Sequence, residues 1–211
     1  GGIDFRYYKG LHQDVLTDLF GGTYFIDSYN RKNVTAENNP AVGGNSSYIN
    51  EKLNVGDVLR RDYDGFVMYE GVFAQLEYNQ DKLSAFVSGG ASNTGYWRYD
   101  RMYYSKDNAK SSTKNYLGGN IKGGANYNLT ENHNVFFNLG YISRAPKFSY
   151  GAFMQANSSH AINKDAKNEK VLSFELGYGF LNSWLTANVN AYWTKWLDKA
   201  MTKSGQLDNQ E

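Results

Sequence analysis

Residues 168–180 read NEKVLSFELGYGF, and their side chains alternate in character from one position to the next. One set of positions is apolar: Leu172, Phe174, Leu176, Tyr178 and Phe180. The positions between them hold Ser173, Glu175, Gly177 and Gly179. A period of two places successive side chains on opposite faces of an extended chain, so this stretch predicts a β-strand with one apolar face and one polar face.

The same alternation recurs in five further stretches, at 72–78, 83–91, 117–127, 135–141 and 185–193. Their apolar positions include Leu76, Val87, Ile121 and Leu139. Together the six stretches offer 29 apolar-face positions, and none of them carries a charge or an amide. Because 20% of the whole chain is charged, this exclusion indicates a face that meets no water.

The composition agrees with a protein built of strands and turns. The 211 residues include 18 Tyr, 22 Gly and only 2 Pro, and aromatic residues suit pleated surfaces while Gly suits tight reversals. A net charge of +1 gives no indication of nucleic-acid binding. The absence of cysteine excludes disulfides and thiolate metal sites. No stretch approaches the roughly 20 apolar residues that a membrane helix needs.

Two features favour a membrane barrel over a soluble sheet. The polar faces are rich in Gly and Asn, and aromatic residues stand near the ends of the apolar faces, at Tyr78, Tyr127, Tyr141, Phe180 and Trp193. Aromatic residues at both ends of an apolar band are typical of barrels that span a bilayer. In lipid every backbone amide must pair within the protein, so such a sheet has to close. The fold class that we predict is all-β, an antiparallel transmembrane β-barrel segment.

The connections between these strands alternate between short and long. Residues 79–82, 128–134 and 181–184 are short, whereas 97–116 and 145–170 are long and polar. Outer-membrane barrels have short turns on one side and long loops on the other. A seventh strand is expected at 3–9, followed by a long excursion over 11–65 that contains a short helix at 12–20.

Several stretches resemble the barrels of TonB-dependent outer-membrane receptors. They are GIDFRYYKGLHQDVLTDLFGG (2–22), GVFAQLEY (71–78), IKGGANYNLTENHNVFFNLGYISRAPKF (121–148), NEKVLSFELGYGF (168–180) and NVNAYWTKWLDK (188–199). The most specific part is an LGYISRAP strand end followed by a returning NEKVLSFELGY strand. The resemblance is dense over 66–199 and weak over 23–65.

This resemblance implies a barrel of roughly 22 strands, of which the chain supplies about seven. It implies a plug domain inside the barrel, energy passed from TonB through that plug, and an extracellular nutrient as ligand: a siderophore, vitamin, peptide or glycan. The sequence contains no plug, no TonB-contacting segment, no leader and no terminal aromatic strand. We therefore expect residues 1–211 to be an internal part of one barrel domain in the outer membrane, with lipid and lipopolysaccharide as further partners and no nucleic acid.

Two other interpretations stay open at this point. The first is a small standalone outer-membrane barrel of about eight strands that serves as an adhesin or a passive pore. The second is a soluble β-sandwich that binds carbohydrate, in which one face of each sheet packs on a core and the other meets water.

A cluster of aromatic and charged residues over 96–104 is the best candidate for a ligand site. The predicted ligand-binding residues are Trp97, Arg98, Tyr99, Asp100, Arg101, Tyr103 and Tyr104. Aromatic faces stack on sugars or rings, and the two arginines with the aspartate offer hydrogen bonds to polar groups. The alternative is that these aromatic residues extend the outer aromatic girdle and contact lipid headgroups.

Four charges on or beside the strands have predicted positions. Glu77, Lys122 and Glu175 fall on the polar phase, where they face the lumen and contact a plug or brace neighbouring strands. Arg144 precedes Ala145 and is expected where its strand leaves the membrane, meeting lipopolysaccharide phosphates or snorkelling to the interface.

The histidines predict no chemistry. His12, His133 and His160 are scattered, and none has a partner at the spacing of metal ligands. A hydrolase would need a nucleophile or an activated water, and only His12 with Asp14 or Asp18 offers such a set. We predict no catalytic residue, no cofactor and no metal, and a receptor rather than an enzyme.

Overall fold

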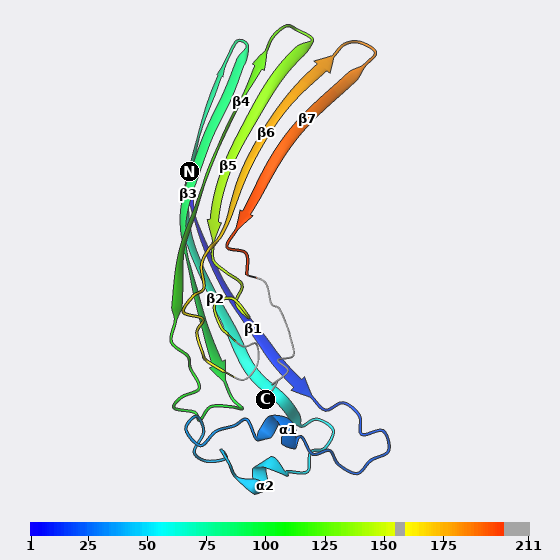
Figure 1. Cartoon of the computed structure of the whole chain (residues 1–211), viewed down its shortest axis with the longest axis vertical. Helices are drawn as coiled ribbons and strands as arrows, with labels where there is room; N and C mark the ends of the chain where they lie inside the picture. The colour runs from blue at the N-terminus through cyan, green and yellow to red at the C-terminus, as the bar shows by residue number, and fades with distance from the viewer. Residues whose placement is uncertain (155–158, 201–211) are drawn as a thin grey trace, which may run out of the picture.

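The computed structural model describes residues 1–154 and 159–200, which form one antiparallel sheet whose seven strands lie in sequence order (Figure 1). The strands are β1 (Gly2–Val15), β2 (Val58–Gln80), β3 (Leu83–Asp100), β4 (Lys114–Asn128), β5 (His133–Arg144), β6 (Glu169–Leu181) and β7 (Thr186–Leu197). Two single-turn helices, α1 (Ser28–Arg31) and α2 (Ser46–Ile49), lie between β1 and β2. The predicted seven-stranded all-β fold is confirmed.

Short and long connections fall at opposite ends of this sheet, as the sequence predicts. Residues 81–82, 129–132 and 182–185 are the short ones and lie at one end, here named the turn end (top of Figure 1). The long connections follow β1, β3 and β5, and their described residues, 16–57, 101–113, 145–154 and 159–168, lie at the other end, here named the loop end. At the first turn Asp81 has a φ of 47°, the left-handed conformation that Asp tolerates in tight reversals.

The strand register places all six predicted apolar stretches on one face. Directly paired residues in neighbouring strands point to the same side of a sheet. One such row, six residues long, runs Leu76, Val87, Gly123, Leu139, Phe174, Trp193. We name this side the apolar face. The adjacent row runs Glu77, Phe86, Gly124, Asn138, Glu175, Tyr192, and we name its side the polar face.

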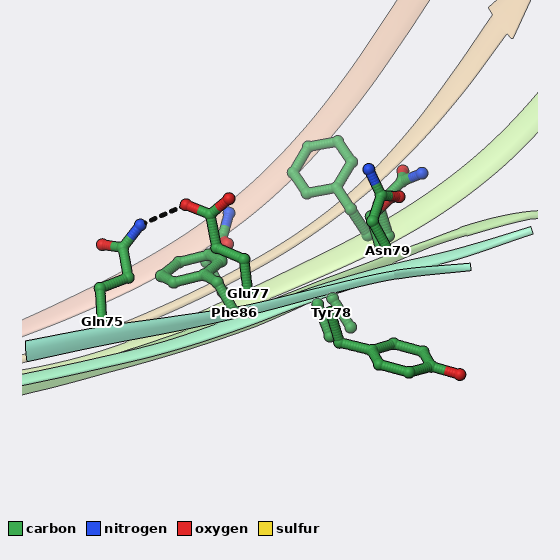
Figure 2. Close-up of a pocket in the computed structure, with 12 residues that line it drawn as sticks. Gln75, Glu77, Tyr78, Asn79 and Phe86 are labelled. Carbon is green, nitrogen blue, oxygen red and sulfur yellow. Dashed lines mark hydrogen bonds between the residues drawn. The ribbon is translucent and has the colours of Figure 1, made fainter.

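The sheet is curved, and the polar face lines its concave side. Figure 2 shows Gln75, Glu77 and Phe86 pointing to the side on which the later strands rise, while Tyr78 points the opposite way. The rows of directly paired residues are not parallel to the edge of the sheet at the turn end. Tyr78 lies two residues before the end of β2, whereas Leu176, in the same row, lies five residues before the end of β6. This offset is the register shift that closes a barrel.

Glycines on the polar face make room for the aromatic rings of adjacent strands. Phe136 of β5 pairs with Gly177 of β6, and its ring lies where a Cβ on Gly177 would stand. A Cβ on Gly124 would collide with the amide of Asn138 and meet the ring of Phe86 at 2.9 Å. The side chains of this face therefore lie across neighbouring strands, which explains the Gly-rich polar phase seen in the sequence.

No second layer covers the apolar face in the described residues. Leu76, Ile121, Leu139 and Leu176 are each more than half exposed, and one sheet contains every strand. A soluble sandwich would bury these side chains between two sheets, so that interpretation is wrong for this part of the chain. Within residues 1–154 and 159–200, no helix has the length and the apolar content to cross a membrane.

The predicted helix at 12–20 is wrong. Residues up to Val15 continue β1, because His12 and Gln13 pair with Tyr63 and Asp62 of β2. The carboxylate of Asp14 accepts hydrogen bonds from Arg60 and Arg61 and closes this end of the strand pair. Pairing with a neighbouring strand has overridden the local helical pattern. The part of the expected 11–65 excursion that lies outside β1 and β2 is 16–57.

The expected start of the loop after β3 is also wrong. Residues 96–100 remain in β3 and pair with Tyr63 to Val67 of β2. The loop proper spans 101–113, and it begins with a short extension of the sheet, because the amide of Asp100 donates to Ala109 O at 2.8 Å. β2 and β3 have 23 and 18 residues, more than the roughly 10 residues with which a strand crosses a bilayer. β3 therefore continues beyond the end of its apolar alternation.

Candidate functional site

The buried side chains of the described residues gather at the loop end. There residues 145–154 and 159–168 lie over the polar face of β3 and β4, and Ala152 and Phe153 pack with Tyr96 and Tyr116. The hydroxyl of Tyr96 donates to Pro146 O at 3.0 Å. A second cluster joins the 16–57 connection to the 101–113 loop through Val34, Met102 and Tyr103. The long loops therefore form a packed cap rather than separate excursions.

Arg98 is the centre of this cap and is fully buried. Its guanidinium stacks on the ring of Tyr63 at 4.0 Å, approaches Phe153 at 5.7 Å and donates to Ser159 O at 2.6 Å. The carboxylate of Asp100 lies 3.7 Å away. Burial lowers the pKa of Arg98, and the aromatic and carboxylate neighbours oppose that shift.

Asp100 is fully buried as well and holds the start of the 101–113 loop. Its Oδ1 accepts hydrogen bonds from the backbone amides of Met102 at 2.9 Å and Tyr103 at 2.6 Å. Tyr103 lies 2% exposed, and its hydroxyl donates to Arg60 O at 2.6 Å. Burial raises the pKa of Tyr103 to about 12. These two residues tie the end of β3 to the start of β2.

Arg101 belongs to an ion network on the other side of the sheet. Its guanidinium donates to Asp62 at 2.7 Å and to Asp64 at 2.9 Å, and Lys9 reaches Asp64 at 3.1 Å. Asp62 and Asp64 share the apolar face with Leu76 by strand parity. Charge therefore replaces apolar surface on this face towards the loop end.

Trp97 lies next to this network in an aromatic stack. Its ring is parallel to that of Phe66 at 5.1 Å, and Tyr7 of β1 approaches both rings at about the same distance, 6.1 and 6.2 Å. Tyr99, on the same side of β3, is half-buried beside Lys110. Tyr104 stacks on His160 at 3.8 Å, and its hydroxyl accepts from the amide of that residue.

The structure thus separates the seven predicted ligand-binding residues. Arg98, Asp100 and Tyr103 are buried in the cap, whereas Trp97, Tyr99 and Arg101 lie on the apolar-face side. A ligand would reach Arg98 only if Phe153 and Ser159 moved away. Sequence analysis did not place Phe153 or His160 beside Arg98, because an irregular loop has no period that predicts its packing.

The predicted inward charges lie on the polar face. Glu175 accepts hydrogen bonds from Asn138 at 3.0 Å and Asn190 at 3.1 Å, and Glu77 accepts from Gln75 at 2.6 Å. Amides of the same strand or of neighbouring strands brace these carboxylates where oppositely charged partners were expected.

Arg144 is the last residue of β5, at the strand end where it was expected, but it points to the polar face rather than to lipid. It shares the polar face with Asn138 by strand parity and is paired to Glu169, with N···O distances of 3.0 and 2.7 Å. The odd-numbered residues of β5, including Leu139, occupy the apolar face, so an even-numbered arginine has to point inwards.

His160 makes the cap sensitive to acid. Burial and the Arg98 cation lower its pKa, while hydrogen bonds to the Ala109 and Asn108 backbones oppose the shift. The neutral ring is therefore favoured in the packed cap, and this stabilisation is lost as the pH falls below the ordinary histidine pKa of about 6.5. We expect hydrogen exchange in 148–154 to accelerate between pH 7 and pH 5.

The control for this prediction is His160→Gln, which keeps a polar group but does not titrate. This variant should remove most of the pH dependence of hydrogen exchange in 148–154. Burial also lowers the pKa of His12, so His12→Gln should remove the pH dependence that is left. An unchanged pH profile in the double variant would contradict the assignment.

The apolar face has the height of a bilayer. On β6 the uncharged positions run from Leu172 to Phe180, and Lys170 is the next residue on that face. On β7 they run from Ala187 to Trp193, with Lys195 next. Nine residues from Leu172 to Phe180 match the roughly 9–11 tilted residues with which a strand crosses the hydrocarbon core.

Among residues 1–154 and 159–200, no group of three His, Asp or Glu side chains is placed to hold a metal ion. The candidate site consists of the packed loops of the cap and the charged residues of the polar face, and we assign no catalytic group to it.

The comparisons with known proteins agree with this geometry. A search of curated proteins found no significant match. The family model described as TonB dependent receptor-like, beta-barrel matches residues 2–210. That match covers nearly the whole chain, and the apolar band, the short turns and the long loops are those of a membrane barrel. The chain belongs to the family of TonB-dependent receptor-like β-barrels.

Proposed function

We propose that this chain forms part of the barrel of an outer-membrane receptor that imports a scarce nutrient with energy passed from TonB. The family supports a receptor and transport role in the outer membrane. The observation that carries the proposal is the sheet itself, which presents an uncharged band of bilayer height on one face and a Gly- and Asn-rich surface on the other. No covalent chemistry is part of this function.

The open edges support a larger barrel. The described strands β1 and β7 each pair on one side only, and an unpaired strand edge in lipid leaves backbone groups without partners. We propose that residues 1–211 are part of one barrel domain, that further strands close it, and that a plug domain fills its concave side and contacts TonB.

The loop end supports roles for lipid and ligand. Lys170 and Lys195 occupy the apolar face just beyond the uncharged band, where they would meet lipopolysaccharide phosphates. Of the predicted ligand-binding residues, we propose that Arg98, Asp100, Tyr103 and Tyr104 act by fixing the cap, and that Trp97, Tyr99 and Arg101 contact ligand or headgroups at the surface.

A growth experiment tests the uptake role. A strain that lacks the gene is compared with the parent strain in media limited in turn for iron, cobalamin, peptide or glycan. We expect a defect under one limitation, and we expect loss of TonB to reproduce it. Normal growth in every medium, or a defect that is absent when TonB is removed, would contradict the proposal.

A further inference from the structure

A cleft opens on the polar face close to the turn end (Figure 2). It lies between β2, β3, β4 and β5, and its volume is about 380 Å³, within the range of about 300–1,000 Å³ that small-molecule sites occupy. None of the clustered residues of the cap lines it, so the cleft is separate from the loop end. Short turns face the periplasm in outer-membrane barrels, so a solute would meet this cleft late in its passage.

Two phenylalanine rings form the apolar part of the cleft. Phe86 of β3 pairs with Gly124 of β4, and Phe136 of β5 pairs with Gly177 of β6. Because a Cβ on either glycine would meet the ring opposite, each ring rests against the backbone of the next strand. Phe86 remains 37% exposed, and Phe136 is half-buried. Each ring therefore keeps a surface that is open to the concave side.

Amide side chains surround the two rings. The hydroxyl of Ser84 donates to Asn79 Oδ1 at 2.6 Å, and the amide of Gln75 donates to Glu77 at 2.6 Å. These bonds use only part of what each group offers, because a primary amide has two donor hydrogens and an acceptor oxygen with two lone pairs. The edge of the cleft therefore supplies both donors and acceptors. Its lining amides are Gln75, Asn79, Asn126 and Asn138.

The cleft carries little charge. Glu77 is the one charged residue among the described residues that line it. Lys122 lies on the same face two residues before Gly124, and Glu175 accepts a hydrogen bond from Asn138 at 3.0 Å, but both stand outside the lining. A carboxylate at the edge repels phosphate and carboxylate ligands. An exposed carboxylate that is already hydrogen-bonded attracts a cation only weakly, so the lining favours an uncharged ligand.

We propose that this cleft binds a sugar ring of a neutral glycan on its way out of the barrel. The C–H face of the sugar lies against Phe86 or Phe136, and its hydroxyls meet the amides at the edge. A pyranose has an apolar face and a polar rim, which match an aromatic surface bordered by donors and acceptors. The inference rests on the proposed receptor function and names the class of its nutrient.

Protection of a thiol in the cleft tests this site, because the chain contains no cysteine. Ser84→Cys places the thiol in the cleft, and Thr194→Cys places one on the polar face of β7, outside the cleft. The full-length protein, in a zwitterionic detergent that has no sugar headgroup, is treated with an uncharged methanethiosulfonate. Millimolar maltotetraose, xylotetraose, mannotetraose and laminaritetraose are added in turn.

We expect at least one of these saccharides to slow the reaction at position 84 by about threefold, the effect of a ligand at about twice its Kd. None should slow the reaction at position 194. Triglycine and citrate, at the same concentration, should protect neither position, because neither has a flat apolar face to lay on a phenylalanine ring.

Matched variants test the aromatic surface. Phe86→Leu keeps an apolar side chain but removes the ring, so the protection at position 84 should be lost. Phe86→Tyr keeps the ring and should retain the protection. Phe73→Leu is the control, because Phe73 lies on the same face of β2 but outside the cleft, and it should leave the protection unchanged.

Four results would overturn the proposal. They are no protection of position 84 by any saccharide, equal protection by triglycine or citrate, and protection that survives Phe86→Leu. The fourth is a thiol at position 84 that does not react at all, because the plug then covers the cleft.

Failure of this inference can be told apart from failure of the receptor function. Thiols at Leu176→Cys and Asn190→Cys report whether the two faces meet lipid and water. If position 190 reacts, position 176 does not, and no saccharide protects position 84, the barrel stands and the glycan site does not. A growth defect confined to iron, cobalamin or peptide limitation would likewise keep the receptor and exclude a glycan.

Discussion

Arginine in place of Leu176 should destabilise the folded barrel by about 2–4 kcal/mol, the range found for a cation at the bilayer midplane on the lipid face. Leu176 lies at the centre of the uncharged band between Leu172 and Phe180 and is 52% exposed on the apolar face. The guanidinium would have to leave water for hydrocarbon. Denaturant titration of the full-length protein refolded in lipid vesicles measures the loss.

Asn190→Arg is the matched control. Asn190 pairs with Gly177 on the polar face, and its amide donates to Glu175 at 3.1 Å. An arginine there stays in water beside a carboxylate, so its effect should be below about 1 kcal/mol. Equal losses at the two positions would contradict the assignment of the faces.

Arg98→Met should loosen the cap by about 3–5 kcal/mol, because removing one partner leaves a buried charge without compensation. The Asp100 carboxylate is fully buried 3.7 Å from this guanidinium. Methionine fills much of the same volume, so the loss reports charge and hydrogen bonding rather than a cavity. The opening free energy of amides in 148–154, from hydrogen exchange, measures it.

Arg101→Met, three residues further along, is the control for this second prediction. Arg101 is one-third exposed and bridges Asp62 to the buried Asp64, which keeps Lys9 as a partner at 3.1 Å when Arg101 is replaced. Exposed ion pairs contribute about 0–1 kcal/mol, so the opening free energy of amides in 148–154 should stay close to that of the unchanged protein. A larger loss in Arg101→Met than in Arg98→Met would refute the central position of Arg98.

The repeating part of the fold could be predicted from the sequence because each strand repeats every second residue. Leu76, Val87 and Phe174 share one row of the sheet, and the alternation alone assigns each to the apolar face. Turn residues such as Asp81 mark where strands reverse. Membrane barrels are regular because lipid allows no unpaired backbone, and a regular strand shows a two-residue period in its sequence.

The loop end could not be predicted in the same way. His12 and Tyr96 lie in strands that continue past the bilayer, and they pair with Tyr63 and Val67, which are 51 and 29 positions distant. Arg98 looks like a surface ligand residue in sequence, yet Phe153 covers it from 55 positions away. Arg144 ends its strand as the sequence predicts, and the parity of β5 assigns its side chain to the polar face.

The oblique rows of the sheet determine the pitch of the whole wall. Between β2 and β6 the end of the strand moves from two to five residues beyond a shared row, roughly three-quarters of a residue for each strand crossed. With about 3.3 Å per residue and about 4.8 Å between strands, this step inclines the strands by about 25–30° to the barrel axis. Strands added at either open edge have to adopt the same inclination. A one-residue insertion in β4 would therefore disturb the ring far from where it was made.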